Sequence, residues 1–174
     1  MARFRPLAAQ TTPLEDLRRM LQTLLAERFH LVVHSEEKLQ PAYTLVLAKF
    51  GPKLQPSETA ILTEQRCVPG QGDVGVKHIQ CRHMTTAMLA GVLQEQSPRE
   101  VDAPVVDQTG LTGAFDFKLD WAPAPRTADA PADPLPGPTI FEAVESQLGL
   151  KLESKKLPLP IIVIDRVDRV PTGN

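Results

Sequence analysis

The chain has 174 residues, of which 42% are hydrophobic and 23% charged, and its formal net charge is −2 at pH 7. This size and composition fit one globular domain that can bury enough surface to fold without a metal or disulfide. A weakly acidic chain lacks the basic face that nucleic acids require, so no nucleic-acid partner is expected. No apolar run approaches the ~18 residues of a membrane-spanning helix, and no apolar segment follows the charged residues 1–6. The sequence therefore predicts neither a membrane span nor a signal peptide.

The expected organisation is a loose leader over residues 1–11 and a single α+β domain over 12–170, with two long loops. The first loop, 49–76, is rich in glycine and proline, and connections of this length are often functional. The second, 122–138, is rich in alanine, proline and aspartate, so no regular structure is predicted there.

The N-terminal part is predicted to be a helix followed by a hairpin. The helix start combines a capping hydroxyl at Thr12, a proline at the first helical position and a capping-box partner at Glu15. Leucines at helical spacing predict a buried face: Leu14, Leu17, Leu21, Leu24 and Leu25. Strands are expected over 29–35 and 42–48, joined by the charged turn Ser35–Lys38.

The central part is predicted to hold a short strand, a helix and a hairpin. The strand covers 77–83, and the helix runs from Thr85 to Gln96 and ends at Ser97-Pro98. Its buried stripe is formed by Met88, Leu89, Val92 and Leu93. The stretch Val105–Phe117 is typical of a strand, a tight turn with Gly110 and Gly113, and a second strand that continues to Trp121.

The C-terminal part repeats this order. A capping box at Thr139 and Glu142 starts a helix, and Gly149 occupies the position of a C-terminal cap. Strands are expected over 150–154 and 161–164. Helix–strand–strand thus occurs three times, over 13–48, 85–121 and 139–168, which predicts helices packed on one mixed, mostly antiparallel sheet.

The serine and histidine residues form no established catalytic motif. The hydrolase pattern Gly-x-Ser-x-Gly is absent, and the serines are interpreted as solvated or capping groups: Ser35, Ser57, Ser97, Ser146 and Ser154. His30 and His34 share one strand face but lie roughly 13 Å apart, too far for one metal ion unless the strand bends. No Gly-rich loop has the strand–helix context of a nucleotide site, so no cofactor-binding residues are predicted.

Cys67, His78, Cys81 and His83 contain the ligand types of a zinc site. His78 and His83 would point to opposite faces of a strand, however, and Cys-x-x-Cys is absent, so no metal site is predicted. Two alternatives for the cysteines remain open, a disulfide or two free thiols. A disulfide would imply an oxidising compartment.

Acidic residues surround the central hairpin: Asp102, Asp107, Asp116 and Asp120. Paired carboxylates can serve acid–base chemistry. Asp107, just before a Gly-containing turn, is expected to bond turn amides and so to have a structural role. Asp165 and Asp168 alternate with arginines and are interpreted as a solvated strand edge.

Five stretches in this order resemble one soil-associated acidobacterial family, a domain of unknown function: 24–29, 43–54, 84–89, 105–117 and 147–153. Members are typically exported, so the resemblance implies a periplasmic or extracellular location. The family resemblance extends to a soil-metagenome hydrolase that opens N-acyl-homoserine lactones and thereby quenches quorum sensing. It implies a lactone as substrate and assigns no catalytic residues.

The sequence and the resemblance therefore favour two alternative functions. The first is a lactone hydrolase, for which His30, His34 or a loop histidine would supply the base. The second is a non-catalytic exported binding or assembly module, because the helix–strand–strand units are also similar in architecture to periplasmic modules of secretins and TonB-dependent receptors. In that alternative, the sheet edges or the loop 49–76 would contact a partner by strand addition.

Overall fold

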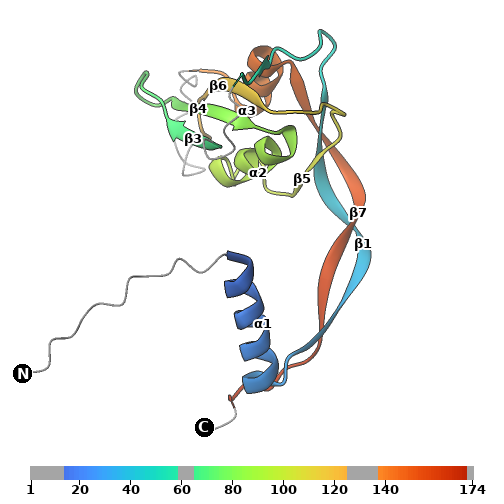
Figure 1. Cartoon of the computed structure of the whole chain (residues 1–174). Coiled ribbons are helices and arrows are strands. Elements are labelled where there is room, and N and C mark those ends of the chain that lie inside the picture. Colours follow the sequence, from blue (N-terminus) through green and yellow to red (C-terminus); the bar gives the residue numbers. More distant parts are fainter. Residues whose placement is uncertain (1–13, 59–64, 125–136, 172–174) are drawn as a thin grey trace, which may run out of the picture. The chain divides into compact units, whose positions relative to one another are not determined.

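The computed structural model describes residues 14–58, 65–124 and 137–171 of the chain (Figure 1). The described residues form an α+β fold, as expected. They group into two compact units: the residues up to Lys38 together with those from Pro158 onward, and Leu39–Leu157. The boundary between the units falls inside two long strands, so each unit is described by itself. The leader 1–11 lies outside the described residues, and most of the loop 122–138 does as well.

The first unit contains the N-terminal helix α1, Leu14–Phe29, at the place the leucine spacing predicts. The capping residues Thr12 and Pro13 lie outside the described residues. The prediction that the leucine face is buried is wrong for the described structure, because Leu17, Leu21 and Leu24 are between 49% and 56% exposed. The spacing of apolar residues indicates which face of a helix is apolar, but it does not indicate whether another element covers that face.

Two long strands correct the prediction of N- and C-terminal hairpins. β1 runs without interruption over Val32–Leu47, and β7 over Leu150–Arg166. They are neighbours in one sheet, and their direction is antiparallel, since Thr44 contacts Glu153 while Ala48 donates to Gly149. The charged segment Ser35–Lys38 is therefore no turn. It is an exposed stretch of extended strand, whose polarity reflects contact with solvent.

In the second unit, four strands form a sheet in the order β2-β6-β4-β3. Their bounds are β2, Gln55–Pro56; β3, Arg66–Pro69; β4, Lys77–Met84; and β6, Phe115–Trp121. The strand predicted over 77–83 is thus confirmed. β2 and β3 lie inside the region expected to be a long loop, 49–76.

The predicted central hairpin is wrong in its pairing. β5, Val105–Asp107, pairs in parallel with β1, so the second sheet has the order β5-β1-β7. β6 belongs to the other sheet and pairs with β4 and β2. The sequence therefore located both strands and the turn between them correctly, but the two strands separate into different sheets.

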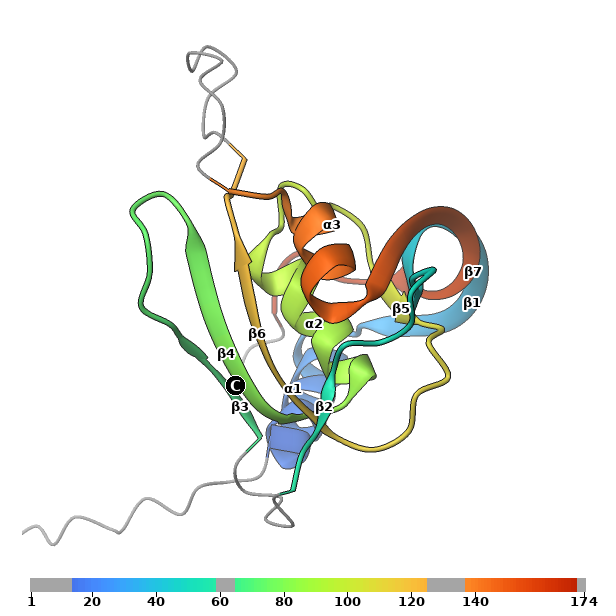
Figure 2. The ribbon, with the colours of Figure 1, turned by 90° about the horizontal axis from the view of Figure 1, so that it is seen from above.

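Helices α2, Thr86–Gln96, and α3, Ile140–Ala143, pack against the same face of β4 and β6 (Figure 2). α3 continues as a π-helical turn, η2, over Val144–Leu148. The two predicted caps of the last helix are present: Thr139 and Glu142 form a capping box, and Gly149 ends η2 with φ = 65°. At the start of α2, the side chain of Thr85 accepts from the Met88 amide, a cap that was not predicted. The shared core draws on both sheets and these helices, with Leu45, Leu89, Leu119, Trp121, Ile140, Leu148 and Leu150 nearly inaccessible.

Candidate active site

The candidate site lies where β4 ends and its pairing with β6 becomes irregular. Cys81 pairs with Phe117, whereas Met84 pairs with Phe115, so β4 contains one residue more than β6 over this interval. This is the arrangement of a β-bulge, which often redirects a side chain beside a functional site. His83 lies in the bulge with φ = 53°, a left-handed conformation that is rare for a residue other than glycine.

Asp116 stabilises the bulge. Its carboxylate accepts a hydrogen bond from the main-chain N–H of His83 at 2.8 Å. This hydrogen bond is the main cause that lowers the pKa of Asp116, and the Ser57 hydroxyl and the charges of Arg82 and His83 lower it further, against a smaller opposing effect of burial. Asp116 is therefore ionised at neutral pH and adds a negative charge next to the imidazole.

Ser57 reaches the same place from a third segment. β2 pairs with β6 through Gln55 and Asp116, and the Ser57 amide then donates to Ala114 O at 2.9 Å. These contacts place the Ser57 hydroxyl 3.4 Å from His83 Nδ1. A hydroxyl, an imidazole and a carboxylate thus converge from β2, β4 and β6.

The connections differ from those of a serine-protease triad. In such a triad, the carboxylate accepts a hydrogen bond from the histidine ring and thereby orients it. Here Asp116 bonds the main chain of His83 and the hydroxyl of Ser57 instead. The carboxylate can still stabilise a protonated His83 through its charge, but the orientation of the ring depends on the bulge.

A pocket of about 540 Å³, within the size range of small-molecule sites, is lined in part by Asp116, whereas Ser57 and His83 are not among its lining residues. It contains one carboxylate, that of Asp116, and three cationic side chains. Its lining includes Lys53, Gln55, Gln80, Arg82, Asp116, Lys118 and Gln147. The electrostatic character of the pocket therefore favours negative charge, whether carried by a ligand or developed during a reaction.

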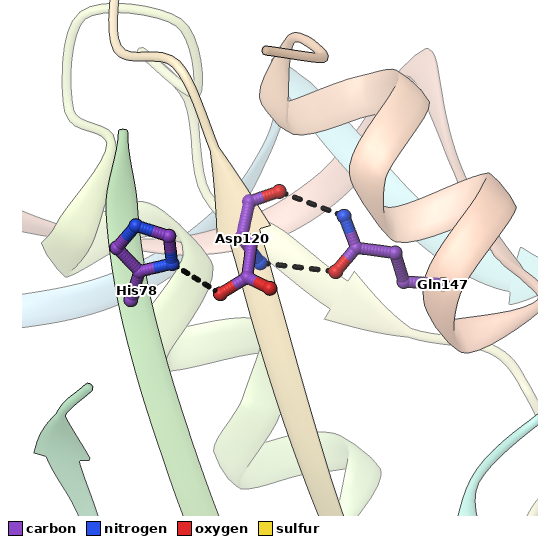
Figure 3. A network of polar contacts seen from close by, with 3 residues as sticks. All are labelled: His78, Asp120 and Gln147. Atoms are coloured by element: carbon purple, nitrogen blue, oxygen red, sulfur yellow. Dashed lines mark hydrogen bonds and ion pairs between the residues drawn. The ribbon is translucent and has the colours of Figure 1, made fainter. Parts of the chain in front are cut away.

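In the second unit, His78 pairs with the carboxylate of Asp120 (Figure 3). Its Nδ1 lies 2.7 Å from Asp120 Oδ1. Gln147 holds the Asp120 main chain at the edge of β6, accepting from its N–H at 3.0 Å and donating to its carbonyl at 2.7 Å.

The other nitrogen of His78, Nε2, is buried and has no hydrogen-bond partner in the described part of the chain. A Cβ at Gly72 would lie only 1.9 Å from this nitrogen, so the loop closely covers it. A general base must reach its substrate. His78 is therefore better suited to a structural role than to catalysis.

The two remaining candidate bases, His30 and His34, belong to the first unit. Their Nδ1 atoms lie 2.7 Å from Asp168 and 2.8 Å from Asp165, respectively, and all four side chains are at least 40% exposed. Asp165 and Asp168 therefore have partners that their interpretation as a solvated strand edge did not include. Among the described residues, neither histidine makes a hydrogen bond to a serine or cysteine side chain.

Cys67 and Cys81 form a disulfide, which decides between the two alternatives left open by the sequence. They lie directly opposite each other on β3 and β4. Their sulfurs are thus unavailable as zinc ligands. Within residues 14–58, 65–124 and 137–171, no group of three or more histidine, cysteine, aspartate or glutamate residues is arranged to hold a metal ion.

The prediction that Asp107 has a structural role is confirmed by its hydrogen bonds. Its carboxylate accepts from the Thr109 amide at 2.9 Å and the Thr109 hydroxyl at 2.8 Å, while Thr86 donates to the other oxygen. The carboxylate therefore ties the turn after β5 to the start of α2.

The sequence offered only part of this site. His83 was considered as a zinc ligand and Asp116 was among the carboxylates, but Ser57 was interpreted as a solvated or capping residue. Its proximity to His83 depends on pairing between β2 and β6, and a two-residue strand has no detectable periodicity. The proline and glycine content of the loop 49–76 also concealed β2.

An α+β domain with a polar pocket beside a serine, a histidine and an aspartate is common to many protein classes, so family membership rests on the sequence comparison. The chain belongs to the family described as protein of unknown function DUF3738, whose model matches residues 3–167. No match was found among curated proteins or solved structures. Among the described residues, no helix is long and apolar enough to cross a membrane.

Proposed function

We propose that this protein is an exported hydrolase that opens N-acyl-homoserine lactones, with Ser57 as nucleophile and His83 as general base. The observation that carries the proposal is the convergence of Ser57 and His83 on Asp116, which lines a pocket large enough for a small molecule. The strained conformation of His83 agrees with this assignment, because such strain is concentrated at functional sites. The Cys67–Cys81 disulfide supports export to an oxidising compartment.

The proposed reaction proceeds in two balanced steps. Ser57 Oγ attacks the lactone carbonyl while its proton passes to His83 Nδ1, and the cationic side chains of the pocket stabilise the resulting oxyanion. The bond between the carbonyl carbon and the ring oxygen then breaks, and His83 returns the proton to that oxygen, which becomes an alcohol. His83 then takes a proton from water, whose oxygen attacks the acyl carbon. The bond from that carbon to Ser57 Oγ breaks and His83 returns the proton to Oγ, while the released acid loses its own proton to solvent and leaves as a carboxylate.

The test is turnover of N-hexanoyl-homoserine lactone by highly purified protein, with ring opening followed by mass spectrometry. Ser57→Ala and His83→Ala are expected to lower kcat/KM by at least about a hundredfold, the usual scale for a lost base or nucleophile. Ser154→Ala and His34→Ala are matched controls on exposed positions and should retain full turnover. Turnover that survives Ser57→Ala, or that does not exceed buffer for the unaltered protein, would reject the proposal.

A second candidate function is a binding module that captures a partner by strand addition. β3 is one of the two edge strands of the four-stranded sheet and lies within the region 49–76. An edge strand presents unpaired main-chain groups to which an extended peptide can add. Absence of turnover, together with binding of an extended peptide, would favour this function over the hydrolase.

A further inference from the structure

The polar face of β3, β4 and β6 carries a pair of arginines that the fold itself does not require. Arg66 lies directly opposite Arg82 in the antiparallel pairing of β3 and β4, and both side chains are exposed. Like charges at directly opposed positions destabilise a sheet. Arg66 has no ion pair or hydrogen bond with the residues that the structure describes, so its charge is left without compensation from its own unit.

Lys118 extends this positive charge across the next strand. It pairs with Gln80, which shares the face of β4 that carries Arg82, because residues two apart in a strand point the same way. Gln80 and Arg82 line the pocket beside Asp116 and also a smaller hollow of about 110 Å³ that includes Arg66. The two hollows therefore adjoin along β4, and we call them together the cationic groove.

The charge balance of the cationic groove favours an anion. Its lining holds four cations, Arg66, Arg82, Lys118 and Lys53, against the single carboxylate of Asp116. Lys53 is partly engaged, since its ammonium donates to Ser146 O at 2.6 Å. Asp120 lies on the same face of β6 but is paired with His78.

We propose that the cationic groove binds the carboxylate of a small organic acid, namely the ring-opened N-acyl-homoserine that the proposed reaction would release. This inference rests on the proposed function, because Asp116 belongs to both the groove and the candidate active site. The lactone is neutral, and a negative charge appears only when the ring opens. Arginine presents paired N–H donors that fit the two oxygens of a carboxylate. The groove therefore distinguishes product from substrate by charge.

The test measures binding in the Ser57→Ala variant by isothermal titration calorimetry, with N-hexanoyl-homoserine and its lactone as separate ligands. The acid is expected to bind about tenfold more tightly than the lactone, as two screened ion pairs would provide. Arg66→Gln and Lys118→Gln should each weaken binding of the acid by about threefold and leave the lactone unaffected. Lys49→Gln, an exposed lysine outside the groove, is the matched control and should change neither affinity.

Equal affinities for acid and lactone, or an unchanged affinity in Arg66→Gln, would overturn the proposal. Inorganic phosphate that binds as tightly as the acid would overturn the carboxylate assignment and indicate a general oxyanion site. Because binding is measured without turnover, an inactive protein that still prefers the acid would refute only the hydrolase mechanism. Thermal unfolding gives an independent readout: the acid should raise the Tm of the Ser57→Ala protein, and this rise should be smaller when Arg66→Gln is also present.

Discussion

The Cys67–Cys81 disulfide allows the most direct test of how this fold is stabilised. It closes a segment with a sequence separation of 14 residues, which includes Gly70, Gly72 and Gly75. In the chain-entropy model, such a loop restricts the unfolded chain by about 3 kcal/mol. Glycines increase the conformational freedom that the cross-link removes from the unfolded state, so the model should apply well here.

The perturbation is Cys67→Ala with Cys81→Ala, because alanine leaves no polar group at the fully buried position 81. Urea unfolding monitored by the fluorescence of Trp121, the only tryptophan, should show a loss of about 3 kcal/mol relative to the oxidised protein. The unaltered protein measured in reductant should lose a similar amount, and reductant should not affect the alanine variant. A loss below about 1 kcal/mol would refute the reasoning and show that β3 constrains this segment without the cross-link.

Three further predictions test individual contacts. Burial raises the pKa of Asp107, but its hydrogen bonds outweigh this effect and lower the pKa. The carboxylate therefore stabilises the fold above about pH 4 and loses this contribution at lower pH. Asp107→Asn should flatten that part of the curve of stability against pH, and an unchanged curve would contradict this. Gly149→Ala should lower the free energy of unfolding in urea by more than about 2 kcal/mol, because φ is 65° and the new Cβ would lie 2.0 Å from Gly51 O. A neutral effect would show that the turn is open. Leu119→Ala should lower the free energy of unfolding by about 2–5 kcal/mol, because Leu119 is fully buried. Leu21 is 56% exposed, so Leu21→Ala should lower it by under about 1 kcal/mol. Equal losses would mean that α1 is buried in solution.

The features that the sequence predicted correctly depend on nearby residues. The capping box at Thr139 and Glu142 and the helix end at Gly149 each involve atoms within a few positions of one another. Asp107 likewise bonds the amide two residues ahead. Such contacts form whenever the local chain conformation is right, so residue type and spacing suffice to predict them.

Strand partners were not predictable in the same way. Alternation correctly placed residues 105–107 and 115–121 in strands, yet it could not show that β5 would join β1 while β6 joined β4. A pattern of period two defines which face of a strand is apolar and leaves its neighbour undefined. The candidate site inherits this limit, because Ser57 approaches His83 only through the pairing of β2 with β6.

The internal repeat explains both why hairpins were predicted and why they are absent. Phe29–Ser35 and Leu148–Ser154 align in sequence, and each indeed marks the place where a helix gives way to a strand. The two strands then pair with each other, since the Asp168 amide donates to Phe29 O and the Ala48 amide to Gly149 O, so each repeated segment faces the end of the other strand. The helices differ in their surroundings. α3 and η2 bury Ile140, Val144 and Leu148, whereas α1 leaves its leucines half exposed. Equivalent apolar patterns therefore have different outcomes, because burial depends on what packs against a helix and the pattern itself does not encode it.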